Sequence, residues 1–321
     1  MKNFWKNKKV VVTGASGFIG RHAVGKLIAK GAQVKAILSP KTDKRKLRKI
    51  FGENINKVIF VKADLLRFKD CLKITKGQNI ILNFAAVDGG SRFKLEHSAE
   101  IFGANMRIVL NMLDASVASK VDRLLLMSSI EVYPKNAKTP IKENTKWDPS
   151  EETNGYIWSK RFSEEIAKIY AKNFGLKIAI ARPGNVYGPG DITGIRKGRV
   201  IPTFIDKMRK KEEIELFEGG KQEKQFIFVD DLISAVLDLT ELYAICDPVN
   251  IVGKEIVTIK QLSEIIKSLI YGSTEKNVKF IMKKSKKIFS TSKLRKSVGF
   301  IPQYSLINGL KETITTFASN V

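Results

Sequence analysis

Val10-Val11-Val12-Thr13-Gly14-Ala15-Ser16-Gly17-Phe18-Ile19-Gly20 is the stretch that decides the fold of this chain. Consecutive valines are typical of a strand that is covered on both faces of a parallel sheet. The glycine spacing that follows predicts a turn in which the backbone approaches a pyrophosphate at the start of a helix. A dinucleotide site is therefore expected here, and the residues expected to contact the dinucleotide are Gly14, Ser16, Gly17, Phe18, Ile19 and Gly20.

Short apolar strands alternate with helical stretches through the first half of the chain. Helices are predicted near residues 18–31, 98–119 and 156–174. Alternating strands and helices joined by right-handed crossovers predict an α/β fold with a Rossmann-type, doubly wound parallel sheet. The predicted strands are Val10–Thr13, Gln33–Leu38, Lys57–Val61, Asn79–Phe84, Arg123–Met127 and Lys177–Ala181.

The pattern changes after residue 182. A glycine- and proline-marked loop over 187–198 precedes a helix over 201–211, and aspartates cap another helix that starts at Val229. Pro248–Ile251 is predicted to return to the sheet as a strand. We expect a nucleotide-binding Rossmann domain of residues 1–182 plus about 226–252. A smaller C-terminal α/β lobe would take about 183–225 plus 253–321.

Composition narrows the class of protein. The 321 residues can bury a full core, and no apolar run is long enough for a membrane span. The two cysteines are too few for a disulfide framework, which indicates a cytoplasmic protein. With two histidines, no metal-ligand cluster is expected.

Positive charge is the unusual feature of the composition. The net charge is +25, and Lys279–Lys296 holds eight basic residues without an acid. Lys35–Lys49 holds seven basic residues and one acid. These runs are either solvated lysine-rich faces or surfaces that attract an anionic ligand.

Tyr156 and Lys160 lie four residues apart on a predicted helix, so they share one face. A nearby ammonium favours the phenolate, so Tyr156 can exchange a proton with a substrate hydroxyl. Ser129 is expected to hold the same oxygen. This order of glycine turn, serine, tyrosine and lysine indicates oxidation or reduction of a sugar-type carbinol.

The end of the second strand distinguishes the two nicotinamide cofactors. An acid there would pair with the ribose 2′-hydroxyl of NAD, but the sequence has Ser39, followed by Lys41. This pattern favours NADP, with NAD as the alternative. Asp64, after the third strand, either contacts the adenine or caps the next turn.

These motifs together resemble the extended short-chain dehydrogenase/reductases of the nucleotide-sugar epimerase/dehydratase group, with local similarity to GDP-fucose synthase. The resemblance covers essentially the whole chain and includes Ser128–Tyr133, Arg182–Pro189, Val200–Pro202 and Gly299–Pro302. It implies a nucleoside-diphosphate sugar as substrate and a homodimer built from the helices near 98–119 and 156–174. Ile166, Ile169, Tyr170, Leu110 and Leu113 could form that interface or the core. Further cofactor contacts implied by the resemblance are Leu65, Phe84, Ala85, Ala86, Asn105 and Pro183. The implied substrate contacts are Val87, Ser129, Asn185, Arg199, Val200 and Lys224.

Two positions depart from GDP-fucose synthase. Glu131 and Arg199 stand where that family has the cysteine and histidine of its epimerisation step. A glutamate at this place is similar to the dehydratases, in which it removes a proton beside a 4-ketone. Glu131 is therefore a catalytic candidate or a polar cap at the strand end.

The first functional hypothesis is an NAD(P)-dependent epimerase or dehydratase that acts through a 4-keto nucleoside-diphosphate hexose in glycan precursor synthesis. The second is a reductase that consumes NADPH on a 4-keto nucleotide sugar. The third is a non-catalytic member of the fold that binds nucleic acid through its positive charge. The presence of Ser129, Tyr156 and Lys160 argues against this third hypothesis. Neither a bound metal nor a membrane partner is expected.

Overall fold

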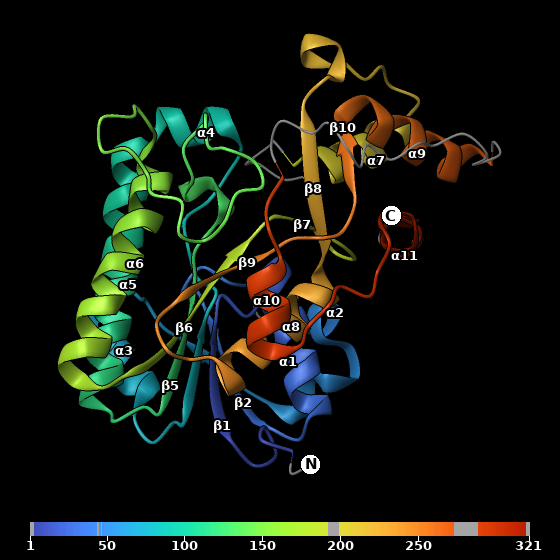
Figure 1. Ribbon diagram of the computed structural model, residues 1–321. Coiled ribbons are helices and arrows are strands. Elements are labelled where there is room, and N and C mark those ends of the chain that lie inside the picture. Colours follow the sequence, from blue (N-terminus) through green and yellow to red (C-terminus); the bar gives the residue numbers. More distant parts are fainter. Residues whose placement is uncertain (1–2, 44, 46, 192–198, 273–287, 319–321) are drawn as a thin grey trace.

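A seven-stranded, all-parallel sheet forms the centre of the larger domain (Figure 1), in the order β3-β2-β1-β4-β5-β6-β9. The structure is a computed structural model that describes residues 3–43, 45, 47–191, 199–272 and 288–318. The strands are β1 (Lys9–Thr13), β2 (Gln33–Leu38), β3 (Val58–Lys62), β4 (Ile80–Asn83), β5 (Arg123–Met127), β6 (Lys177–Pro183) and β9 (Pro248–Ile251). The predicted Rossmann-type sheet is confirmed, with strand ends shifted by at most two residues.

Helices cover both faces of this sheet (Figure 1). One face carries α1 (Phe18–Ala29), α2 (Leu47–Phe51), α8 (Val229–Leu242) and α10 (Ser292–Val298). The other face carries α3 (Phe68–Thr75), α5 (Ser98–Ala118) and α6 (Gly155–Phe174). Because side chains alternate across each strand, β1 supplies Val10 and Val12 to the first core and Val11 to the second.

A smaller lobe follows the carboxyl ends of β6 and β9 (Figure 1). Its sheet has the order β10-β8-β7, formed by β7 (Asn185–Tyr187), β8 (Glu223–Phe228) and β10 (Ile256–Thr258). A separate apolar core joins this sheet to α7 (Val200–Arg209), α9 (Ile259–Tyr271) and α11 (Leu306–Ala318). The short helix α4 (Ser91–Glu96) and the short 3-10 segments η2 (Gly52–Lys57), η3 (Ile130–Val132) and η4 (Phe217–Gly220) lie in connections.

The chain passes between the Rossmann domain and the smaller lobe more often than the sequence predicts. The expected boundary near residue 226 falls inside β8, whose last residues still pair with β7. Residues 253–321 were expected in the lobe, yet α10 packs against α8 and β9 of the Rossmann domain. The loop expected over 187–198 and the basic run 279–296 lie partly outside the described residues.

Candidate active site

The glycine turn has the geometry that the sequence predicts for a phosphate cradle. Gly14 has φ +61°, and a Cβ built there would lie 3.1 Å from the backbone nitrogen of Ala85. A Cβ on Gly20 would lie 2.2 Å from the carbonyl oxygen of Gly14, so no larger residue fits between α1 and β1. The first turn of α1 contains no acidic residue. Free backbone N–H groups at this helix start suit a dinucleotide phosphate.

The loop after β4 is fixed against this turn. The Thr13 hydroxyl donates to Asn83 Oδ1 at 2.6 Å and accepts from the Ala85 N–H at 3.1 Å. Asn105 accepts from the Val87 N–H at 2.7 Å and donates to the Val87 carbonyl at 3.0 Å. Asn105 therefore orients the segment that includes Phe84, Ala85 and Ala86, rather than pointing a free amide at a cofactor.

At the end of β2, Ser39 and Lys41 are exposed, and the Lys41 N–H donates to Ser39 Oγ at 3.4 Å. Lys62 donates to the Pro40 carbonyl at 3.0 Å, which places a second cation at the strand tip. Asp64 caps the following turn, where its Oδ1 accepts from the Leu66 N–H at 3.1 Å. The capping alternative for Asp64 is thus observed, with the side chain of Leu65 buried behind it.

Ser129, Tyr156 and Lys160 come together at the carboxyl end of β5. Tyr156 is buried in the first turn of α6, which begins at Asn154 through a side-chain cap on the Ile157 N–H. Tyr156 is hydrogen-bonded to Ser129. Lys160 Nζ donates to the Met127 carbonyl at 2.6 Å and lies 5.5 Å from the Tyr156 ring centroid.

Burial opposes charge on both α6 side chains. It raises the pKa of Tyr156 well above its ordinary value, and the carboxylates of Asp88 and Glu131 add to the rise. The Ser129 hydrogen bond acts in the opposite direction. Burial also lowers the pKa of Lys160 to about 8. Release of the phenol proton therefore depends on the cations that face the ring.

Sequence reasoning missed Lys94, a buried residue of α4. Its Nζ lies 2.8 and 3.0 Å from the two carboxylate oxygens of Glu131, 3.2 Å from Asp88 Oδ1 and 3.7 Å from the Tyr156 ring centroid. Glu131 is thus part of the cluster around Tyr156, where a catalytic role for this carboxylate would require it to lie. The only sequence signal for Lys94 is a lysine within a short helix after β4, which is too common to single it out.

The substrate-contact candidates are spread around the lobe side of the site. Asn185 donates to the Gln225 carbonyl at 3.0 Å, and Lys224 lies one residue away on β8. Arg199 precedes Val200, the first residue of α7. It pairs with buried Asp191 at 2.6 Å and lies 5.4 Å from the Phe18 ring. Pro183 is buried at the end of β6, next to this group.

A buried polar network begins at Ser128, the residue next to Ser129. The Ser128 hydroxyl donates to Glu164 of α6, whose oxygens also accept from Arg182 of β6 at 2.8 and 2.5 Å. Arg182 further donates to the Tyr133 hydroxyl at 2.7 Å, and that hydroxyl donates to Asn250 Oδ1 of β9 at 2.6 Å. The network ties three strands to the helix that carries Tyr156.

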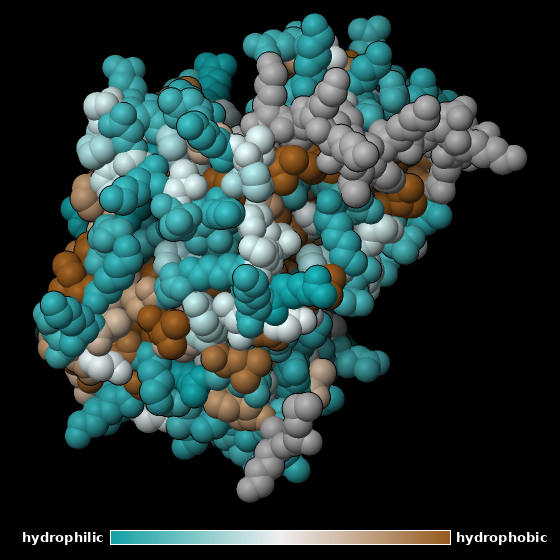
Figure 2. Space-filling view, in the orientation of Figure 1, coloured by the Kyte–Doolittle hydropathy of each residue, from teal (hydrophilic) through white to brown (hydrophobic). Residues whose placement is uncertain are grey.

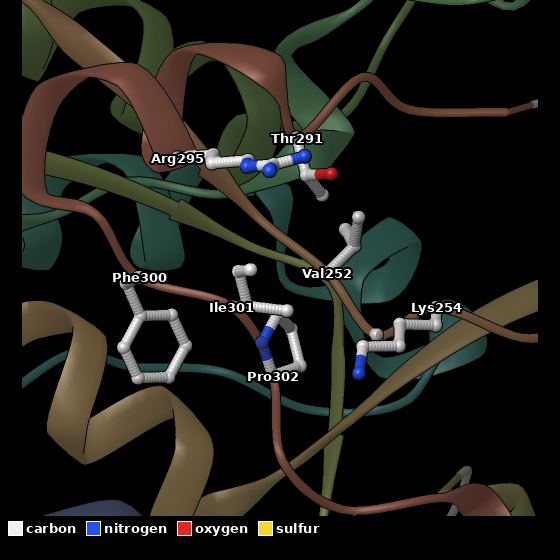
Figure 3. Close-up of a pocket in the computed structure, with 8 residues that line it drawn as sticks. Val252, Lys254, Thr291, Arg295, Phe300, Ile301 and Pro302 are labelled. Carbon is white, nitrogen blue, oxygen red and sulfur yellow. The ribbon is translucent and has the colours of Figure 1, made fainter.

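A separate cavity of about 150 Å³ lies near the Gly299–Pro302 segment (Figure 3). Arg295 of α10 and Thr291, which precedes α10, extend toward it, across from Val252 and Lys254. None of the residues that line it belongs to the cluster around Tyr156. It is therefore distinct from the candidate active site.

Within the described part of the chain, no three His, Cys, Asp or Glu side chains are grouped as a metal site would require. None of the described helices is long and apolar enough to span a bilayer. Cys71 and Cys246 are both free thiols.

A Rossmann sheet, a glycine cradle and a Ser-Tyr-Lys cluster together define a short-chain dehydrogenase/reductase. Residues 10–251 match the NAD dependent epimerase/dehydratase family. The chain belongs to this family, so it is an NAD(P)-dependent enzyme of the extended group that the sequence resemblance indicated.

Curated relatives match most of the chain. It is 33% identical over 318 residues to dTDP-4-dehydro-6-deoxy-D-allose reductase of a Streptomyces species, covering 96% of each chain. It is 31% identical to GDP-mannose 3,5-epimerase 1 of Oryza sativa subsp. japonica, covering 83% of this chain and 70% of that protein. Among solved structures, UDP-N-acetylglucosamine 4-epimerase of Methanobrevibacter ruminantium, in complex with UDP-N-acetylmuramic acid, matches with a TM-score of 0.84. That match has 26% identity and covers 98% of this chain and 100% of the other.

Proposed function

We propose that this enzyme reduces a 4-keto nucleoside-diphosphate hexose to the 4-hydroxy sugar with NADPH. The observation that carries the proposal is the Ser129–Tyr156–Lys160 cluster beside the glycine cradle, in a chain whose full-length relatives include a 4-keto nucleotide-sugar reductase. The residues of the cradle fit a dinucleotide, because a Cβ at Gly14 or Gly20 would fill the space close to the backbone.

The proposed chemistry divides between cofactor and protein. The Gly14–Gly20 turn and Lys160 would hold the dinucleotide, which would supply the hydride for carbon 4. Ser129 donates a hydrogen bond to the sugar O4 and so holds it next to Tyr156. The Tyr156 phenol gives its proton to that oxygen as negative charge develops on it. Lys160 stabilises the phenolate that remains.

The test is to incubate the purified protein with NADPH and a panel of 4-keto-6-deoxy sugars linked to dTDP, GDP and UDP. The expected result is stoichiometric loss of NADPH absorbance and a product two mass units heavier than the substrate. A sugar product of unchanged mass, formed without net loss of NADPH, would instead establish epimerisation. Absence of turnover with the whole panel would contradict the proposal.

A second candidate reaction is epimerisation or dehydration with return of the hydride in one cycle. Glu131 favours it, because a carboxylate within the Tyr156 cluster could remove a proton from a carbon next to a 4-ketone. The similarity to GDP-mannose 3,5-epimerase points in the same direction. A Glu131→Gln variant that still reduces a 4-keto sugar but exchanges no carbon-bound proton with D2O would assign this role to Glu131.

We further propose NADP as the preferred cofactor, since Ser39, Lys41 and Lys62 leave the end of β2 without an acid. Ser39→Asp is expected to raise the Kd ratio of NADP to NAD by about tenfold or more, because a like-charge contact costs more than ~1.4 kcal/mol. Titration of intrinsic fluorescence with each cofactor measures the ratio. Ser39→Asn is the uncharged control, and an unchanged ratio in Ser39→Asp would exclude this position as the discriminator.

The proposed assembly is a homodimer formed through α5 and α6, which pack side by side. Phe162, Ile169 and Phe174 of α6 are 41%, 55% and 58% exposed, and apolar residues gather at this edge of the molecule (Figure 2). Among the other interface candidates, Leu113 packs in the core, and Ile166 and Tyr170 are partly buried against it. We also expect a cytoplasmic location, in keeping with the free thiols.

Ile169→Glu is expected to convert the dimer to a monomer, because a carboxylate would be desolvated in an apolar interface. Light scattering coupled to size-exclusion chromatography measures the mass. Phe217→Glu is the matched control, since Phe217 is 84% exposed but lies on the lobe. A wild-type protein that elutes as a monomer would contradict the proposed dimer.

A further inference from the structure

Lys94 occupies an unusual place for a lysine. The residue is 6% exposed, and its ammonium lies over the face of the Tyr156 ring, 3.7 Å from the centroid. Lys160, the expected partner of the tyrosine, lies 5.5 Å from the same centroid. Lys94 is therefore the closer of the two cations to the ring.

Lys94 is held there by two carboxylates. Asp88, from the loop after β4, and Glu131, from η3, both lie within 3.2 Å of Nζ. A buried ammonium is stable only when it is paired and hydrogen-bonded in this way. The same carboxylates raise the pKa of Tyr156, so the ammonium that binds them also offsets the negative charge that opposes the phenolate.

We propose that Lys94 is a positioning residue that keeps Tyr156 able to release its proton. It offsets the charges of Asp88 and Glu131, and it stabilises the phenolate through the ring face. A cation is attracted more strongly to a phenolate ring than to a neutral phenol, because the full negative charge adds to the ring quadrupole. The proposal deepens the proposed function, in which Tyr156 is the proton donor.

Charged and polar groups from several elements face Tyr156. The direction in which its pKa changes when Lys94 is removed depends on all of these groups. Burial, Asp88 and Glu131 raise its pKa, whereas the Ser129 hydrogen bond and Arg199 lower it. The Lys160 ammonium, on the same helix as Tyr156, is a further positive charge near the ring. Removing Lys94 deletes the closer of the two ammonium groups that face the ring and leaves both carboxylates in place. The pKa of Tyr156 must then rise.

Lys94→Met is the test, read first without any sugar substrate. Protein labelled with [13Cζ]tyrosine is titrated by NMR in the presence of NADP. Tyr156→Phe identifies the signal among the seven tyrosines. The Tyr156 midpoint is expected to move up by about one pH unit or more in Lys94→Met, as is typical for loss of an opposite charge within contact distance.

Three controls separate this role from a structural one. Lys94→Arg keeps the positive charge and is expected to restore the wild-type midpoint. Lys35→Met, which removes a half-buried lysine whose Nζ donates to the Ile74 carbonyl, is expected to leave the midpoint unchanged. In the double variant Lys94→Met/Glu131→Gln, one negative charge is also removed, so part of the shift is expected to reverse.

The second readout is the pH profile of kcat. In reduction, kcat falls at alkaline pH as Tyr156 loses its proton. This fall is expected at higher pH in Lys94→Met than in wild type. The variant is also expected to have a lower kcat at neutral pH. A Tyr156 midpoint that is the same in wild type and Lys94→Met overturns the proposal, whatever the enzyme turns over. A shifted midpoint in a protein that reduces no 4-keto sugar would uphold the role of Lys94 and refute only the proposed reaction.

Discussion

Tyr156→Phe is expected to lower kcat by about 10³-fold, because a positioned general acid contributes roughly 10²–10⁴-fold to such reactions. The substitution removes only the hydroxyl. The ring stays buried against Lys94, and α6 keeps its Asn154 cap. KM and the Kd for NADP should therefore change little. Steady-state kinetics measures kcat and KM, and fluorescence titration with the cofactor measures its Kd.

Tyr170→Phe is the matched control on the same helix. The Tyr170 hydroxyl donates to Asp114 of α5, away from Ser129 and Lys160, so its loss should leave kcat within about twofold of wild type. Near-normal turnover in Tyr156→Phe would refute the proton-donor role. Equal losses in the two variants would mean that the helix, rather than the phenol, is being disturbed.

Arg182→Met is expected to destabilise the fold by about 3–5 kcal/mol at neutral pH, since removing one partner of a buried ion pair leaves an uncompensated charge. Glu164 and Arg182 are both buried, and the Tyr133 hydroxyl also depends on Arg182. Burial alone would lower the Arg182 pKa, but Glu164 and Tyr133 raise it above its ordinary value. The Arg182 guanidinium is thus charged in the folded protein. Urea unfolding followed by circular dichroism measures the loss.

The double variant Arg182→Met/Glu164→Gln tests the cause. Neutralising both partners should recover part of the stability lost in Arg182→Met, because no buried charge is then left unpaired. Additive losses across this cycle would show that Arg182 acts through packing rather than through Glu164. A loss below about 1 kcal/mol in Arg182→Met would contradict the buried-pair argument altogether.

The sheet could be predicted because its signals are local. The run Val10–Val12 must be covered on both faces, and the glycines that follow allow little besides a turn into a helix. Gln33–Leu38 and Arg123–Met127 carry the same apolar signal, and both occur as strands with these bounds. Some strand ends moved by one or two residues: Lys57 lies in η2, so β3 begins at Val58.

The cluster around Tyr156 was predictable only in part. Tyr156 and Lys160 share a helix face, so their spacing alone places them together. Lys94 and Glu131 are 37 residues apart and meet only because β4 and β5 are neighbours in the sheet. The packing of α10 against α8 depends equally on the final topology. Contacts of this kind leave no periodic signal in the sequence.

Arg199 belongs to the lobe, yet its guanidinium rests on Phe18, the first residue of the helix that follows the phosphate turn. A sugar diphosphate that drew Arg199 toward itself would alter the surface that a dinucleotide meets. The affinities for the two ligands would then be linked. Thermodynamics requires that such linkage be reciprocal: the factor by which the sugar diphosphate changes the affinity for the dinucleotide must equal the factor by which the dinucleotide changes the affinity for the sugar diphosphate.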